Sequence, residues 1–283
     1  MATETTSGTG WPAAKAKPAA QQVPWYRPIL DRSYFLGTAV AVVGLIALWE
    51  WATATERVHP VVVASPTDTF NRFVEIIQEP FFHEHLSYTL REIFAGFAIG
   101  TGAAIAMAWV SSAFPLFRSI IHPFVVAFQS IPKIILLPII VVWFGLGMRS
   151  TITIVMLIAF FPTYVNTFTG LSLSRPDGLK LLHSLGASRV QIFWKLRLPT
   201  ALPLVFTGLK TSMNFSITGA IVGEYFGARF GLGFLVNQYA YLLRTDSLYA
   251  TVMFIAIFAV LMFGLLELLD RKLIFWRERA GGH

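Results

Sequence analysis

Residues 248–269 read LYATVMFIAIFAVLMFGLLELL, and this stretch decides the fold class. It holds 22 residues, of which Glu267 is the only charged one. A helix of about 20 mostly apolar residues is long enough to cross the hydrocarbon core of a bilayer. The stretch therefore predicts a membrane-spanning helix.

The composition of the whole chain agrees with this prediction. Of the 283 residues, 55% are hydrophobic and 13% are charged, and the mean hydropathy is +0.63. Soluble domains carry about 25% charged residues, so this chain has too few to cover a water-soluble globule. The 14% aromatic content and the scattered glycines exclude a disordered, collagen-like or coiled-coil chain. The lack of cysteine excludes disulfides, thiolate metal sites and cysteine nucleophiles.

Five further apolar runs are long enough to span a membrane: residues 35–51, 87–110, 119–142, 151–170 and 203–223. With 248–269 they predict an all-α, polytopic membrane protein with six transmembrane helices and both termini on one side. A signal peptide is the alternative for the first run, because Ala52-Thr53-Ala54 is similar to a cleavage site. The 34-residue leader argues against it. We expect a disordered cytoplasmic tail over 1–34, the membrane domain over 35–275 and a C-terminal cytoplasmic tail over 276–283.

The distribution of basic residues predicts the orientation. The net charge is +7, and 22 residues are Lys or Arg. Fourteen of them lie in the N-terminal tail, at Arg118, in the 171–200 link and at positions 271–279 near the C-terminus. Six lie on the opposite face, and Lys133 and Lys210 lie inside spans. Cytoplasmic segments carry the excess of Lys and Arg, so both termini are predicted to be cytoplasmic. The same bias explains the net charge without nucleic acid as a partner.

Two stretches outside the spans have helix signals of their own. Ser65 can cap an amphipathic helix with Pro66 at its first position, which we expect on the outer surface or against the bundle. In the 171–200 link, a short helix over 176–185 can end at Gly186, and Ser188 can cap a second helix over 189–196. Apolar side chains on these two helices must be shielded from water, either by the protein's own helical bundle or by a partner protein.

The link carries the first residues of a family resemblance. The segment LGASRVQIFWKLRLP at 185–199 resembles the coupling loop of binding-protein-dependent ABC importer permeases, in which a glycine and nine residues precede Ile-x-Leu-Pro. Other pieces resemble the nitrate, sulfonate and taurine group of this family, in the same order over 35–275: SIPK at 130–133, WFGLG at 143–147, TGLK at 207–210, GAIVGE at 219–224 and GLG at 231–233. One position departs from the pattern. Lys180-Leu181-Leu182 stand where the family has Glu-Ala-Ala, which removes the acidic partner for a salt bridge but leaves apolar side chains for docking.

The resemblance implies the type I permease fold of ABC importers and a location in the bacterial inner membrane. A separate ATPase dimer would push the short helices of 177–197, so that the spans alternate between inward-facing and outward-facing states. Two copies of the chain would line one path, and an extracytoplasmic binding protein would deliver the solute. The sequence has no Gly-x4-Gly-Lys-Ser/Thr phosphate loop, so we expect neither ATP hydrolysis nor a cofactor in this chain. The residues expected to couple it to the ATPase are Leu181, Leu182, Leu185, Gly186, Ala187, Ser188, Leu198 and Pro199.

Polar residues within the spans are candidates for the solute pathway. An ionisable residue at the centre of a membrane helix costs about 2.5–3.5 kcal/mol, so its presence points to a pathway or to an internal partner. Lys133 follows Pro132, where a broken helix could hold an anion, although the side chain could instead extend to the interface. Glu224 could gate the outer mouth or be solvated, and the preceding Gly219 and Gly223 could form a close helix contact between two copies. The candidates are Gln129, Ser130, Lys133, Asn166, Asn214 and Glu224, although such polar groups also join helices without binding ligand.

Other site classes find no support in the sequence. His83-Glu84-His85 places two histidines on different faces of a helix without a third ligand nearby, so no metal site is predicted. No close Ser/His/Asp set or carboxylate pair can be placed in the bundle for catalysis. We therefore expect a permease subunit that moves a small organic or anionic nutrient; the alternatives are a self-sufficient secondary transporter and a membrane-embedded enzyme. SIPK and GAIVGE resemble permeases for thiamine-pyrimidine or riboflavin precursors, while sulfonates, nitrate and aromatic carboxylates stay open. The pairing of two identical or two different permease chains also stays open.

Overall fold

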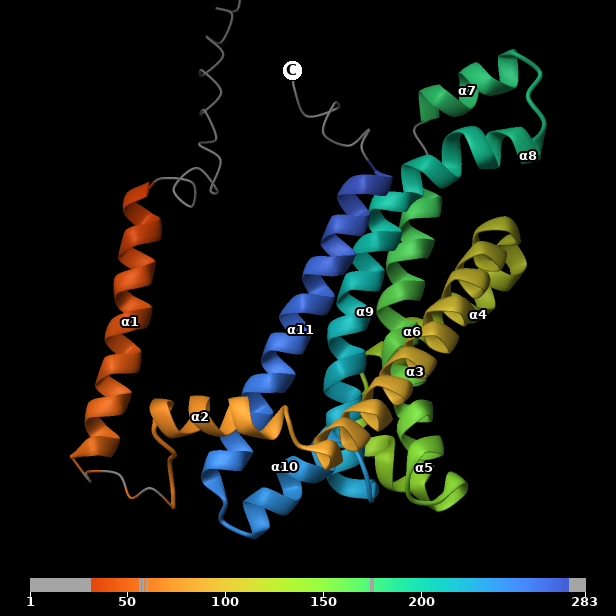
Figure 1. The fold of residues 1–283 in the computed structure, drawn as a ribbon. Coiled ribbons are helices and arrows are strands. Elements are labelled where there is room, and N and C mark those ends of the chain that lie inside the picture. Colours follow the sequence, from red (N-terminus) through yellow and green to blue (C-terminus); the bar gives the residue numbers. More distant parts are fainter. Residues whose placement is uncertain (1–31, 56, 58, 60, 174–175, 275–283) are drawn as a thin grey trace, which may run out of the picture. The chain divides into compact units, whose positions relative to one another are not determined.

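The computed structural model describes residues 32–55, 57, 59, 61–173 and 176–274. Within these residues the regular structure is helical and contains no strand, which confirms the all-α prediction (Figure 1). The predicted tails lie outside the described residues, apart from positions 32–34 at the start of the first helix. The chain divides into two compact units, Met1–Trp49 and Glu50–His283.

The helices carry the labels of Figure 1. In chain order they are α1 (Arg32–Ala54), α2 (Pro66–Ile76), α3 (Pro80–Ala113), α4 (Pro115–Gln129), the 3₁₀ turn η2 (Lys133–Leu136), α5 (Leu137–Phe144), α6 (Met148–Ser172), α7 (Pro176–Ser184), α8 (Arg189–Ile192), the π-helical segment η3 (Phe193–Arg197), α9 (Leu198–Gly227), α10 (Leu232–Tyr241) and α11 (Thr245–Leu273).

Four described helices are long and apolar enough to cross a membrane, namely α1, α3, α6 and α11. They contain the predicted spans 35–51, 87–110, 151–170 and 248–269. The predicted span 119–142 is a bent pair, because α4 and the η2–α5 segment meet at an angle of 93°. Pro132 lies at the bend; proline lacks an N–H and forces the preceding residue out of the helical region. The break predicted beside Pro132 is therefore confirmed.

The fifth predicted span, 203–223, lies inside the 30-residue helix α9. This helix is continuous, but it is not among the four that are apolar enough to count as spans. The structure thus contains four or five apolar spans in its described part.

Within the second unit, α6 is the central helix and packs along α3 and α9. Glycines allow these helices to approach closely: a Cβ at Gly96 or Gly100 would collide with Val155 or Met156 of α6. Buried Ile, Val, Met and Ala side chains of α3, α5, α6 and α9 form the core between them. The rigid centre of the unit is therefore the α3–α6–α9 layer.

The short helices of the second unit lie at opposite ends of this layer. The segment α7–α8 lies at one end, and α2, α5 and α10 lie at the other (Figure 1). Ser65 caps α2 as predicted, since its Oγ accepts the N–H of Asp68 at 3.0 Å. On the same helix, the Nε of Arg72 donates to Ser247 of α11 at 3.0 Å. This bond fastens α2 to the corner between α10 and α11.

Candidate functional site

The α7–α8 segment is built by the caps that its sequence predicts. Gly186 adopts φ +70°, the left-handed conformation that ends α7, and the Ala187 N–H donates to the Leu182 carbonyl at 3.0 Å. Ser188 and Gln191 then form a reciprocal capping box that starts α8. The turn between the two short helices is therefore set by local chemistry.

The second short helix has no separate end. α8 continues through the π-helical η3 into α9, and the Leu198 N–H donates to the Phe193 carbonyl five residues earlier. Proline at 199 has no N–H to donate, and a π turn beside it shifts the hydrogen-bond ladder by one residue. α8, η3 and α9 therefore form one continuous helical rod.

Apolar side chains on this segment stay uncovered by the second unit. Leu181, Leu185, Val190 and Trp194, here named the α7–α8 patch, are 60%, 72%, 66% and 63% exposed. An apolar patch at a helix end that its own bundle leaves open is typical of a protein contact. Of the two covers that the sequence left open, the described part of the bundle does not supply one for these side chains.

The other predicted coupling residues lie in and around this turn. Leu182 and Ala187 are half-buried, Ser188 is exposed at the start of α8, and Leu198 and Pro199 are half-buried at the start of α9. A cavity of about 1040 Å³ lies beside them, between the segment and the adjoining ends of α3, α6 and α9. Its walls are mainly apolar, with Trp109 and Phe193 in edge-on contact.

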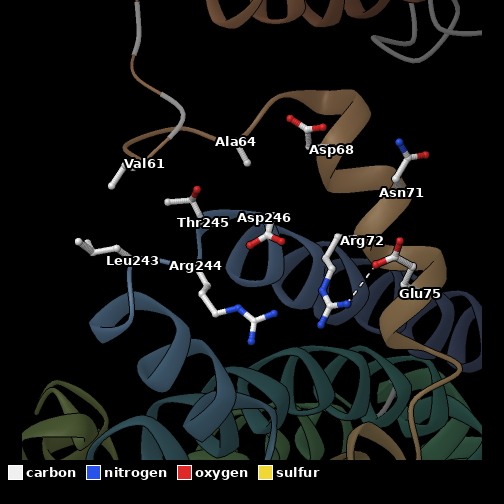
Figure 2. Close-up of a pocket in the computed structure, with 10 residues that line it drawn as sticks. All are labelled: Val61, Ala64, Asp68, Asn71, Arg72, Glu75, Leu243, Arg244, Thr245 and Asp246. Atoms are coloured by element: carbon white, nitrogen blue, oxygen red, sulfur yellow. Dashed lines mark hydrogen bonds and ion pairs between the residues drawn. The ribbon is translucent and has the colours of Figure 1, made fainter.

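A second cavity, of about 480 Å³, lies at the other end of the unit (Figure 2). It is open and charged, and Figure 2 shows Asp68 and Arg72 of α2 facing Arg244 and Asp246 of the α10–α11 corner. At its rim Leu243 has φ +55°, which a non-glycine residue adopts only at a cost, and its side chain is exposed. Sequence reasoning missed this cavity, because its walls come from segments about 175 residues apart.

Arg72 in the wall of this cavity is paired with carboxylates of its own neighbourhood. Arg72 donates to Glu75 at 3.1 Å and to Glu79 at 2.9 Å. Burial lowers the pKa of the Arg72 guanidinium, but the bonds to the two carboxylates outweigh it, and the net pKa is raised. Arg72 is thus a fixed positive charge in the wall of the cavity.

Three of the predicted pathway residues meet at the bend between α4 and η2. The Lys133 ammonium donates to the Gln129 carbonyl at 2.6 Å and lies 4.9 Å from the centre of the Phe161 ring of α6. It therefore satisfies a carbonyl at the end of α4 and stacks on an aromatic face. Gln129 and Ser130 are exposed beside it.

The other pathway candidates lie elsewhere. Asn166 of α6 donates from its amide to the Pro162 carbonyl of the same helix at 2.9 Å, so its side chain has a partner within its own helix. Asn214 is exposed on α9, between Thr207 and Thr218, in a polar stripe with helical spacing. Among the described residues, no hydrogen bond, ion pair or ring contact joins Asn166, Asn214 or Glu224 to the bend.

Glu224 is fully buried at the end of α9, neither solvated nor in the wall of a described cavity. Its Oε2 accepts the Gly233 N–H at 2.7 Å and so caps the start of α10. The close approach predicted at Gly219 and Gly223 occurs within the chain, because both glycines face α6. Glu92 of α3, which sequence reasoning did not single out, is equally buried beside Glu224.

Lys210 has two partners that only the fold reveals. Its ammonium lies 2.8 Å from Glu267 and 2.7 Å from Asp270, both on α11. Glu267 lies 57 positions and Asp270 lies 60 positions after Lys210, so these ion pairs have no signal in the local sequence. Lys210 therefore joins α9 to α11 and has no need to extend to the interface.

Residues 96–275 match the family described as the binding-protein-dependent transport system inner membrane component. This match covers more than half of the chain. The chain belongs to this family. It is thus a transport permease of the inner membrane, and the predicted resemblance is confirmed.

Among the relatives of this permease are three transport proteins of known name. The formylaminopyrimidine permease ThiX of Halalkalibacterium halodurans is 30% identical over 83% of this chain and 93% of its own length. The riboflavin permease RibX of Chloroflexus aurantiacus is 27% identical over 85% of this chain and 90% of its own length. The taurine permease TauC of Escherichia coli is 30% identical over 91% and 94%. These relatives are permeases rather than enzymes.

Solved structures share the fold of this permease. A chain of the inward-facing MetNI methionine ABC transporter matches with a TM-score of 0.54 and 23% identity, over 66% of this chain and 91% of that chain. A chain of an amino acid ABC transporter matches with the same TM-score, 16% identity and 73% and 96% coverage. The permease therefore has the type I fold of ABC importers, as predicted.

Proposed function

We propose that this permease is the membrane subunit of an ATP-driven importer that carries a small organic or anionic nutrient into the cell. The observation that carries the proposal is the α7–α8 patch, an exposed apolar face on a rigid turn that is continuous with α9. Closure of a separate ATPase dimer on ATP would press this turn, and the rod formed by α8, η3 and α9 would transmit the movement to the spans. Leu181, Leu185 and Trp194 supply the contact, with Lys180 exposed beside them.

For the topology we propose six spans with both termini in the cytoplasm. In this topology the four apolar helices are four of the spans, the bent α4–η2–α5 segment is the fifth and α9 is the sixth. The basic residues of α7, α8 and η3 support the cytoplasmic side for this end, since membrane proteins keep Lys and Arg inside. The charged cavity around Arg72 then faces outward, where an extracytoplasmic binding protein can dock.

We also propose that two copies of the permease enclose the path. An exposed polar stripe on a membrane helix is costly against lipid but suits a water-filled path between subunits. Thr207, Asn214 and Thr218 form such a stripe on α9. Gln129 and Ser130 at the α4–η2 bend offer further polar groups for a path.

The cargo is proposed to be a small organic solute of the kind that the relatives carry. Two of their names specify planar ring compounds, a formylaminopyrimidine and riboflavin, and one specifies taurine. The Lys133 ammonium is already bound to a carbonyl and an aromatic face, which disfavours a fixed anion site at the bend. Selection among these solutes therefore falls to the binding protein.

Reconstitution into proteoliposomes tests the function. The permease, a candidate ATPase and a candidate binding protein should together take up solute only with ATP, and an ATPase lacking its phosphate-loop lysine should give none. Ion-driven uptake by the permease alone would overturn the proposal in favour of a secondary transporter.

The lack of native cysteine makes the topology testable in intact cells. Leu243→Cys should react with a membrane-impermeant maleimide from outside. Leu181→Cys should react only after the membrane is opened. The reverse pattern would refute the orientation.

A further inference from the structure

Two buried carboxyl groups meet where α3, α9 and α10 join. Glu92 of α3 and Glu224 of α9 are both 0% exposed. The Glu92 carboxyl lies within hydrogen-bonding reach of the Glu224 carboxyl and of the Thr151 hydroxyl of α6. Neither carboxyl has an assigned place in the transport cycle proposed above.

The donors around this pair are too few for two carboxylates. The Gly233 N–H donates to Glu224 Oε2, whereas Glu224 Oε1 and both oxygens of Glu92 have no hydrogen-bond donor. The nearby hydroxyls also have backbone carbonyls as acceptors: the His85 carbonyl lies 3.3 Å from the Thr89 hydroxyl, and the Gly147 carbonyl lies 3.4 Å from the Thr151 hydroxyl. Three buried acceptor atoms are thus left without partners, which is rare in folded proteins.

The described part of the chain supplies no ion pair to these two carboxyl groups. Among the described residues, no Lys or Arg forms an ion pair with Glu92 or Glu224. A further titratable group near the junction is His85 of α3, whose Nδ1 accepts the Gly231 N–H at 3.0 Å. From α6 and α10 the groups that face the pair are the uncharged Thr151 hydroxyl and the Gly233 amide.

A single proton resolves both problems. A protonated carboxyl is a hydrogen-bond donor, so it can bond to its neighbour. It also removes the repulsion between two like charges that share one buried site. We propose that Glu92 and Glu224 bind one proton between them, with Glu92 as donor and Glu224 as acceptor, and that this bond holds the α3–α9–α10 junction together.

The proposal predicts a pH-dependent stability. The unfolded chain releases carboxyl protons above about pH 4.3, whereas the folded pair keeps one at neutral pH. Because the folded state then binds more protons than the unfolded state, stability falls as the pH rises. The range from neutral pH to about pH 9 lies above the ordinary titration of histidine at about pH 6.5. Titration of His85 therefore does not contribute to the change in stability over this range.

Infrared spectroscopy of the purified chain in deuterated buffer tests the proton directly. At neutral pH the wild type should show the C=O stretch of a protonated carboxylic acid. Glu92→Gln should lose this band, because the amide supplies the donor that the proton supplied. The exposed Glu84 on the same helix provides the matched control, and Glu84→Gln should keep the band.

Thermal unfolding gives a second readout. When the pH is raised from neutral to about pH 9, the thermal unfolding midpoint of the wild type should decrease by about 2–4 °C or more. The midpoint of Glu92→Gln should change less over the same range. Absence of the band in the wild type, or an equal pH dependence in Glu92→Gln and wild type, would overturn the proposal. Should Glu92→Gln fail to fold, Glu224→Gln must lose the same band, since its amide can accept from Gly233 and donate to Glu92. Neither measurement needs transport, so failure here is distinct from failure of the importer assignment.

Discussion

A single charge inside a membrane helix is accommodated only when the fold supplies partners, and Lys210 illustrates this at the scale of the residue. Its ammonium lies between Glu267 and Asp270 of α11. The Lys210 side chain is 14% exposed and that of Asp270 is 6% exposed, so water screens this pair only weakly. Arg271 contacts Glu267 at 3.2 Å from the other side.

Replacement of Lys210 by methionine should therefore destabilise the protein. The change removes the Lys210 ammonium from the buried Asp270 carboxylate, and breaking a buried pair in this way costs about 3–5 kcal/mol. We expect about 3 kcal/mol here, since Glu267 stays partly hydrated, measured as a lower thermal midpoint in detergent. Lys272→Met removes an exposed cation from the same end of α11 and serves as the control. Equal midpoints for the two variants would contradict this account.

Gly186 offers a test of the turn between α7 and α8. Its φ is +70°, and a Cβ added there meets nothing within 4 Å, so substitution acts through the backbone alone. Gly186→Val should distort the turn at a cost of about 1–3 kcal/mol and abolish transport and ATPase coupling, with membrane insertion intact.

The control for this prediction is Gly186→Asn, because asparagine tolerates the left-handed conformation better than other residues. This variant should keep most of the uptake of the wild type. Unchanged uptake in Gly186→Val would refute the coupling role of the turn.

At the scale of the element, the side chains of the α7–α8 patch determine how this segment can bind a partner. Leu181 lies near the end of α7 and Leu185 lies in the turn directly after it, and both side chains are mostly exposed. The neighbouring Lys180 is exposed and basic, so it offers no carboxylate for a salt bridge. Apolar contact rather than a salt bridge should then supply the affinity for the ATPase.

The double change Leu181→Asp and Leu185→Asp should abolish co-purification with the ATPase. A few central apolar residues carry most of the binding energy of an interface, and each costs more than about 1–2 kcal/mol when removed. Lys180→Ala should leave the complex intact. Loss of the complex in Lys180→Ala with retention in the double variant would reverse the assignment.

The caps of the α7–α8 segment could be predicted from the sequence, but the continuous connection from α8 through η3 into α9 could not. Gly186 and Ser188 act through bonds to residues a few positions away, so their roles can be inferred from spacing. The π turn before Pro199 depends on how α8 and α9 align in space. That turn makes α8, η3 and α9 one rod, which no local pattern revealed.

At the scale of the whole molecule, the proposed dimer can be tested with single cysteines. Asn214→Cys, in the exposed polar stripe of α9, should form a crosslinked dimer with a short thiol crosslinker in membranes. Val260→Cys is exposed on the apolar helix α11 and should stay monomeric. A crosslink at position 260 but not at 214 would place the contact between copies on another face.

The sequence by itself determined the membrane class, the helical architecture, the break at Pro132, the α7–α8 turn and the family, since these depend on composition, local spacing and motifs. The ion pairs of Lys210, the charged cavity around Arg72, the inward packing of Gly219 and Gly223 and the pairing of Glu92 with Glu224 required the tertiary structure. Each of these joins helices that lie far apart in the chain. Hydrophobic periodicity shows which face of a helix is buried, but it does not show which helix packs against that face.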